Sequence, residues 1–241
     1  MATKHMKYFI ANWKMNGSAE SLTNYCEQLI SKEHLMPESV ILALPALYIP
    51  LAQKMLHDTP IAIAAQCVSA HTDGAYTGQL SAQMFAEFGC QYALIGHSER
   101  RAMESIASTY DQMIQCLEAG IKPILCIGET LQEKKELKTK EVLASQLKPM
   151  LTLQAQDHDI WVAYEPRWAI GSGLTPDNNE INMIAEWFKN LTDSKFIYGG
   201  SVNPKNIENL SECTLDGFLV GGASLDYNLT NQMVDVCTQF S

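Results

Sequence analysis

Eight short apolar segments recur along the chain at nearly regular intervals, and this repetition restricts the possible folds more than any other feature. The segments are YFIANW from residue 8, VILALP from 40, IAIAAQ from 61, YALIGH from 92, PILCIGE from 123, IWVAYEP from 160, FIYGG from 196 and GFLVGG from 217. They do not alternate apolar with polar residues, which is typical of parallel strands covered on both faces. Because parallel strands need crossover connections, usually helical ones, we predict an α/β protein.

Helical patterns lie between these segments, as in Ile181, Ile184, Ala185 and Phe188, which share one face of a helix. A strand and a helix repeated eight times in 241 residues match the dimensions of a (β/α)8 barrel, the TIM barrel. The number of strands alone also allows a doubly wound open sheet. However, no G-x-G-x-x-G follows the first strand and no Pro/Gly/Ser-rich linker divides the chain. We therefore predict a single barrel domain over residues 1–241, with residues 1–5 as a candidate N-terminal extension.

The composition limits the classes of partner that the protein is expected to bind. The net charge is −10 and the isoelectric point is near 5.0, so we expect no broad binding to nucleic acid or to an anionic membrane. The seven cysteines contain no C-x-x-C pair, which favours reduced thiols in the cytoplasm over a disulfide framework or a zinc ribbon. No apolar run reaches membrane-spanning length, and the first residues lack the features of a signal peptide. We expect a cytoplasmic protein that binds any anionic ligand through a locally positive site.

Polar residues and glycines follow several predicted strands at the point where the apolar run stops. The set is Asn12, Lys14, His97, Glu165, Ser201 and Gly221. Taken singly, each has an ordinary explanation, such as a solvated lysine, a structural histidine or a carboxylate that caps a turn. A barrel, however, gathers the carboxyl ends of all its strands at one mouth, where the active sites of this fold lie. We therefore predict that the set forms one site.

The residue types in this set indicate the chemistry. The glycines of YGGSV and GGASL leave backbone N–H groups free to approach an anion, and barrel enzymes often hold phosphate in the loops after strands seven and eight. Lys14 adds a positive charge. One carboxylate and one histidine without metal-ligand spacing favour general acid–base catalysis over metal-assisted hydrolysis. The chain has neither H-E-x-x-H nor G-x-S-x-G.

Six motifs in order, NWKMNG, GHSERR, CIGE, YEPRWAIGSG, YGGSV and GFLVGGASL, extend over nearly the whole chain. In these motifs the sequence resembles the triosephosphate isomerase family. The resemblance implies a cofactor-free interconversion of dihydroxyacetone phosphate and D-glyceraldehyde 3-phosphate in glycolysis and gluconeogenesis. It implies that Glu165 is the catalytic base and His97 the neutral electrophile, with Glu99 as a supporting partner. Lys14 would balance negative charge and Asn12 would position Lys14.

The same resemblance implies a phosphate site and a lid. Backbone N–H groups at Gly171, Ser201, Gly221 and Gly222 would hold the phosphate. In the lid, hinges at residues 166–168 and 171–173 flank the tip Ala169-Ile170, and Tyr198 and Ser201 resemble residues that latch the closed lid. Thr175 and Pro176 are predicted to begin the following helix as its cap and first residue.

The resemblance also implies a homodimer, formed through a loop at residues 67–81 that enters the partner subunit. Three positions depart from the family pattern: Arg167 and Ser172 in the lid, and Gln79 where glutamate is usual. The glutamate at position 79 would face Arg100 of the partner subunit, so a neutral amide is expected to weaken that contact.

Two other functions remain as alternatives. The first is a non-catalytic barrel that binds a phosphorylated metabolite or acts as a scaffold. Phosphate binding alone does not require the complete set Asn12, Lys14, His97 and Glu165, which favours an enzyme. The second is a barrel isomerase that acts on larger sugar phosphates.

Overall fold

The computed structural model describes residues 6–31, 39–154 and 159–238, so the candidate extension at residues 1–5 lies outside the described residues. The described chain forms a closed barrel of eight parallel strands, in which β1 pairs with both β2 and β8. The strands are β1 Tyr8–Asn12, β2 Val40–Leu44, β3 Ala62–Ala65, β4 Tyr92–Ile95, β5 Lys122–Ile127, β6 Trp161–Tyr164, β7 Phe196–Tyr198 and β8 Gly217–Val220. Each of the eight predicted strands and the single-domain barrel are confirmed.

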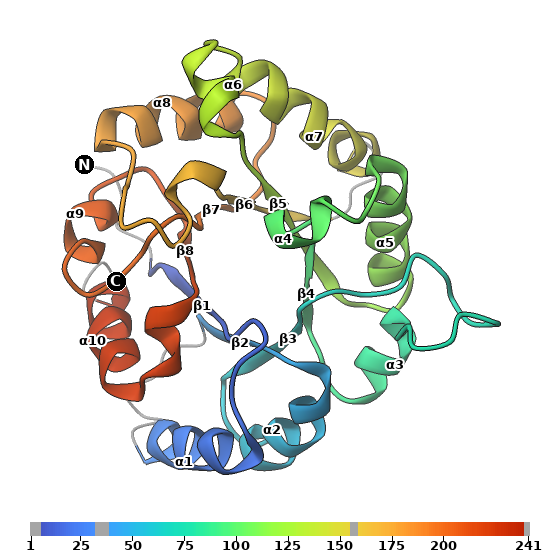
Figure 1. Ribbon diagram of the computed structural model, residues 1–241. Coiled ribbons are helices and arrows are strands. Elements are labelled where there is room, and N and C mark those ends of the chain that lie inside the picture. The colour runs from blue at the N-terminus through green and yellow to red at the C-terminus, as the bar shows by residue number, and fades with distance from the viewer. Residues whose placement is uncertain (1–5, 32–38, 155–158, 239–241) are drawn as a thin grey trace.

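Helices surround the barrel and alternate with the strands along the chain (Figure 1). The α-helices are α1 Ala19–Ile30, α2 Ile49–Leu56, α3 Ala82–Glu87, α4 Ser98–Arg101, α5 Ile106–Glu118, α6 Leu131–Lys135, α7 Thr139–Gln154, α8 Asn178–Lys189, α9 Ile207–Ser211 and α10 Tyr227–Thr238. Within the described ranges, the short 3-10 helices are η2 Ala46–Tyr48, η3 Arg167–Ala169 and η4 Gly222–Leu225. The connection from β3 to α3 projects outside the ring of helices (Figure 1).

Neighbouring residues of each strand pack into two different apolar layers. Ile10 belongs to a cluster that fills the barrel interior together with Leu94 and Ile197. The adjacent Phe9 belongs to the larger cluster between the barrel and its helices, which also contains Phe188. This double burial explains why the strands read as continuous apolar runs.

Aromatic side chains close the end of the barrel where the strands begin. The ring of Trp161 lies 4.4 Å from that of Tyr8 and 5.1 Å from that of Tyr92, between centroids. The three residues are the first of β6, β1 and β4. Lys122 places its Nζ 5.1 Å from the Trp161 ring, and Lys195 places its Nζ 6.0 Å from the Tyr8 ring. We call these three rings and two lysines the aromatic plug.

The predicted start of the helix after the lid is wrong by two residues. The first helical residue is Asn178, and the cap is Asp177, whose side chain accepts a hydrogen bond from the backbone N–H of Glu180 at 2.9 Å. Asp177 was overlooked because Thr175 and Pro176 also match a helix start. The predicted buried face of this helix is confirmed, since Ile181, Ile184, Ala185 and Phe188 are all buried.

Candidate active site

The predicted site residues all follow strand ends, so they lie at the mouth of the barrel. Asn12 is the last residue of β1, and Glu165 directly follows β6. His97 brings its Nε2 to 3.2 Å from Glu165 Oε1. Lys14 lies near the loop after β8, because a Cβ placed on Gly221 would come 3.5 Å from Lys14 Cε. Residues from four strand ends, far apart in the sequence, thus share one mouth.

Glu165 is a carboxylate with almost no exposed surface, at 1%. Its backbone N–H donates to Ile127 O at 2.6 Å, and its Oε2 accepts from the backbone N–H of Ser98 at 3.4 Å. Two glycines make room for it: a Cβ on Gly128 would come 1.8 Å from the Glu165 carbonyl oxygen, and a Cβ on Gly199 would come 2.8 Å from Glu165 Cγ. Any larger residue at either position would displace Glu165.

The tautomer of His97 follows from its hydrogen bonds. Its Nδ1 accepts from the backbone N–H of Glu99 at 3.3 Å, and a nitrogen that accepts an N–H carries no proton itself. In the neutral ring the proton is therefore on Nε2, the nitrogen that faces Glu165. His97 is 6% exposed, so this N–H points from a largely dry site toward the mouth.

Lys14 has an unusual backbone conformation, with φ at 51°, a region that residues other than glycine rarely adopt. Two amide side chains hold it. Asn12 Oδ1 accepts from Lys14 N at 3.0 Å, and Gln66 Nε2 donates to the Lys14 and Ala43 carbonyl oxygens at 3.0 Å each. The strain at Lys14 is thus maintained by neighbouring strands and fixes where the ammonium can reach.

The ammonium of Lys14 pairs with Glu99, its Nζ 2.5 Å from Oε1. Although partial burial alone would raise the pKa of the Glu99 carboxyl, the hydrogen bond and charge of Lys14 lower it below its ordinary value. Glu99 therefore stays ionised beside the ammonium.

The segment after Glu165 is docked on the loop that follows β7. Ser201 Oγ donates to Ala169 O at 2.5 Å and accepts from Gly173 N at 3.3 Å. Gly171 and Gly173, in the predicted second hinge, have φ of 64° and 75°, a conformation that suits glycine. Tyr198, predicted as a latch, is fully buried and its hydroxyl has no hydrogen-bond partner among the described residues.

Sequence reasoning missed several residues that shape this site. Gln66 ends the third apolar run, so a systematic inspection of every strand end would have found it. Glu129 accepts hydrogen bonds from Trp168 Nε1 at 2.8 Å and from the Tyr164 hydroxyl at 3.3 Å. Arg101, in the GHSERR motif, donates to the carbonyl oxygens of Cys126 and Gly96. Their roles depend on tertiary contacts that no local pattern reveals.

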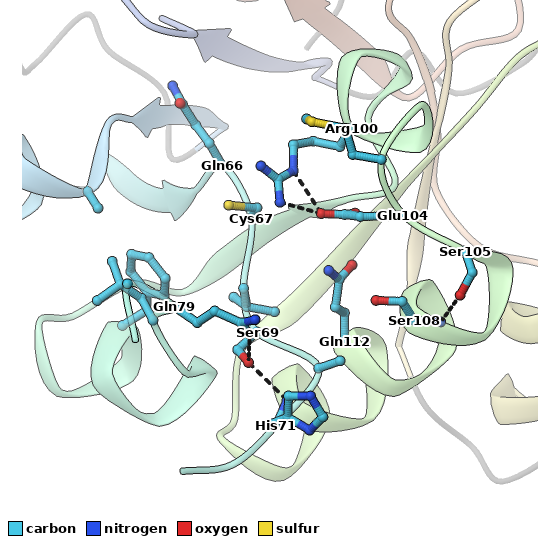
Figure 2. A pocket seen from close by; sticks show the side chains of 17 residues that line it. Gln66, Cys67, Ser69, His71, Gln79, Arg100, Glu104, Ser105, Ser108 and Gln112 are labelled. Carbon is cyan, nitrogen blue, oxygen red and sulfur yellow. Dashed lines mark hydrogen bonds and ion pairs between the residues drawn. The ribbon is translucent and has the colours of Figure 1, made fainter. Parts of the chain in front are cut away.

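A separate cavity of about 670 Å³ lies between the base of the loop at residues 67–81 and the start of α5. Figure 2 shows Arg100, Glu104, Ser108 and Gln112 lining it opposite the loop. Arg100 is paired with Glu104 of its own chain, with Nε 2.8 Å from Oε1. The cavity is not the catalytic mouth, since neither Glu165 nor His97 lines it.

The mouth of this closed parallel barrel carries an imidazole beside a buried carboxylate, with a lysine nearby. These features define the class of (β/α)8-barrel enzymes equipped for proton transfer. No group of three or more potential metal ligands occurs among the described residues. A sequence model of the family named triosephosphate isomerase matches residues 7–237, and the chain belongs to this family.

Individual relatives give the same result. The chain is similar to triosephosphate isomerase of Methylococcus capsulatus, with 37% identity over 90% of this chain and 92% of the relative. It is 39% identical to the enzyme of that name from Dichelobacter nodosus, over 93% of this chain and 96% of the relative. The enzyme of the same name from Aquifex aeolicus is 38% identical over 90% of this chain and 93% of the relative.

Proposed function

We propose that this protein is an isomerase that interconverts dihydroxyacetone phosphate and D-glyceraldehyde 3-phosphate through an enediolate, without a cofactor. One observation carries the proposal: in a member of this family, His97 Nε2 lies 3.2 Å from the carboxylate of Glu165 at the barrel mouth. A base and a proton donor at this separation can act on adjacent carbon and oxygen atoms of one small substrate.

Glu165 is the base in this proposal. Its carboxylate takes a proton from the carbon next to the substrate carbonyl, and the electron pair of the broken C–H bond forms the C=C bond of the enediolate. The Nε2–H of His97 stabilises the carbonyl oxygen and shuttles a proton between the two oxygens. Glu165 then returns its proton to the neighbouring carbon, which leaves the enzyme unchanged.

Lys14 and Asn12 provide the charge balance. Lys14 is the cation that offsets negative charge on the substrate and on the enediolate, and Asn12 holds its backbone through the 3.0 Å contact. Electrostatic stabilisation of this kind is effective because the site is largely dry.

The phosphate is held by backbone N–H groups of Gly171, Ser201, Gly221 and Gly222. Glycines allow the backbone to approach an anion closely. The segment at residues 166–173 acts as a lid over the phosphate, and its closure excludes water from an enediolate that would otherwise lose its phosphate.

A coupled spectrophotometric assay with glyceraldehyde 3-phosphate, run with and without EDTA, tests the function. Turnover that survives chelation is the expected result. A well-folded protein that binds inorganic phosphate but has no turnover would support the non-catalytic barrel instead. Turnover only of larger sugar phosphates would support the second alternative.

We also propose a homodimer formed through the loop at residues 67–81. All residues from 71 to 80 are exposed, and Tyr76 and Leu80 are each 42% exposed. Apolar side chains nearby are more exposed still, with Leu47 at 89% and Met103 at 72%. An exposed loop that carries two large apolar side chains beside an open cavity (Figure 2) suits a two-fold dimer in which each loop enters the cavity of its partner.

Sedimentation across a dilution series tests the dimer, and a fully active monomer at micromolar concentration would contradict it. Gln79 forms a hydrogen bond within its own chain, in which its Oε1 accepts from Ser69 Oγ at 2.6 Å. Gln79→Glu should leave the dimer intact or tighten it, if position 79 faces Arg100 of the partner subunit. A marked loss of dimer would refute that placement.

We place the protein in the cytoplasm, as an enzyme of glycolysis and gluconeogenesis. All seven cysteines are free, and six of them are buried, as expected in a reducing compartment. Among the described residues, no helix has the length and apolar character needed to cross a membrane.

A further inference from the structure

The indole of Trp168, in the first hinge of the lid, is held by a segment outside the lid. Its Nε1 donates to Glu129 Oε1 at 2.8 Å, and Lys134 Nζ lies 4.0 Å from the centroid of its ring. Glu129 and Lys134 both belong to the connection that leads from β5 through α6. The ring is therefore held at its edge by a carboxylate and on its face by an ammonium group.

The position of Lys134 is itself set by α8. Its Nζ lies 2.9 Å from both carboxylate oxygens of Glu180. The two side chains are 31% and 37% exposed, so the ion pair alone contributes little to stability. It does restrict a flexible lysine to one position, which lowers the entropy cost of forming the contact with the indole. Glu180 lies in the first turn of α8, the helix into which the lid leads.

Lys134 thus links the start of the lid to the helix that follows its end. Between these two points the lid is docked on Ser201 through Ala169 and Gly173. A lid of this kind moves through dihedral changes at a few hinge residues. Trp168 has the largest side chain in the hinge, so the contacts of its indole contribute to the free-energy difference between the docked and undocked lid.

We propose that Lys134 is a positioning residue for the lid: with its ammonium fixed by Glu180, it holds the Trp168 indole and so favours the docked lid. Lys134 acts through Trp168 and is not part of the catalytic set. The inference rests on the proposed isomerase function for its kinetic readouts, whereas the contact itself is measurable without substrate.

Lys134→Met tests the proposal because methionine keeps an apolar stem and removes the charge. We expect kcat/KM to fall about 3- to 10-fold, the range that corresponds to one cation–π contact at a partly exposed site. Methylglyoxal formed per turnover should rise, because an undocked lid exposes the enediolate to water. Lys134→Arg keeps a cation over the ring and should restore both quantities to near the parent values.

Lys135→Met is the matched control, since Lys135 is the exposed next residue of α6. It should leave both quantities within about twofold of the parent, as is usual for surface substitutions. If Lys134→Met matches this control, the positioning role is wrong. A lower melting temperature with an unchanged methylglyoxal ratio would show a merely structural role and would also overturn the proposal.

The emission of Trp168, isolated by difference from Trp168→Phe, provides a readout that needs no catalysis. It should change in Lys134→Met and not in Lys135→Met. An inactive parent protein would contradict the proposed function alone. Unchanged Trp168 emission in Lys134→Met would contradict the positioning role alone.

Discussion

The two ends of the barrel are built from the same strands and have opposite character. Where the strands begin, Tyr8, Tyr92 and Trp161 pack ring against ring in the aromatic plug, with lysine ammonium groups over the rings. Where the strands end, Glu165 and His97 meet across 3.2 Å, and Lys14 has a strained backbone. The beginning of the barrel packs aromatic rings, and the end holds polar groups in buried or strained positions.

This difference shows how one fold separates stability from catalysis. Changes in the plug remove packing that no ligand replaces, so they should lower the free energy of unfolding and leave chemistry alone. The groups at the mouth are held in strained or buried positions, which costs stability. Their removal should therefore alter turnover more than the free energy of unfolding. Four substitutions test the separation.

Trp161→Ala should have the largest effect. Trp161 is 2% exposed, and its loss leaves a cavity that should lower the free energy of unfolding by about 3–5 kcal/mol. Urea denaturation gives this value, and an assay at low temperature gives turnover per folded molecule. A fall in turnover as large as the loss of stability would show that the two ends are coupled.

Glu165→Asp is the corresponding change at the mouth. It keeps the charge and withdraws the carboxylate by roughly 1 Å, which should lower kcat by about 10²-fold because proton transfer depends on position. Binding of phosphate-bearing inhibitors and the melting temperature should change little. If kcat stays within a few-fold of the parent, Glu165 is not the base.

Gln66→Leu should have an intermediate effect. It removes the two 3.0 Å hydrogen bonds to the carbonyl oxygens of Lys14 and Ala43, which should cost about 1–2 kcal/mol. The strained backbone of Lys14 can then relax, which moves its ammonium. We therefore expect much of this free-energy cost to appear as a lower kcat/KM, and less of it as a lower free energy of unfolding. A loss of stability with unchanged kcat/KM would mean that Gln66 supports the fold and not the position of Lys14.

Leu137→Gly should have the smallest effect, and it should be stabilising. Leu137 is the other described non-glycine residue with positive φ, at 58°, and it is 93% exposed. Glycine relieves the backbone strain but adds entropy to the unfolded chain, which leaves a net gain of about 0.5–1 kcal/mol. Leu137→Ala, which keeps the strain, is the control. Reduced turnover in Leu137→Gly would show that strain outside the mouth also affects catalysis, which would contradict the separation.

The sequence predicted the barrel well because its signals are local. Each strand is a run of residues buried on both faces, and Ile181 to Phe188 repeat with the period of a helix. The positions of Glu165 and His97 could also be predicted, since both follow strand ends. Gln66 also ends an apolar run, so its place at the mouth could have been predicted, but its role depends on the φ of Lys14, which no pattern of residue types reveals. Lys134 looked like any surface lysine, because Trp168 and Glu180 approach it only in the fold.

Closure of the barrel also has a consequence for how the chain folds during synthesis. The strand β1 pairs on one side with β8, with Phe9 opposite Phe218. This pairing joins the first described strand to the last one, so β1 keeps an unpaired edge until β8 has been made. A nascent chain that lacks β8 presents that edge to other chains. The nascent chain should therefore be prone to aggregation, and dependent on chaperones, until β8 has left the ribosome.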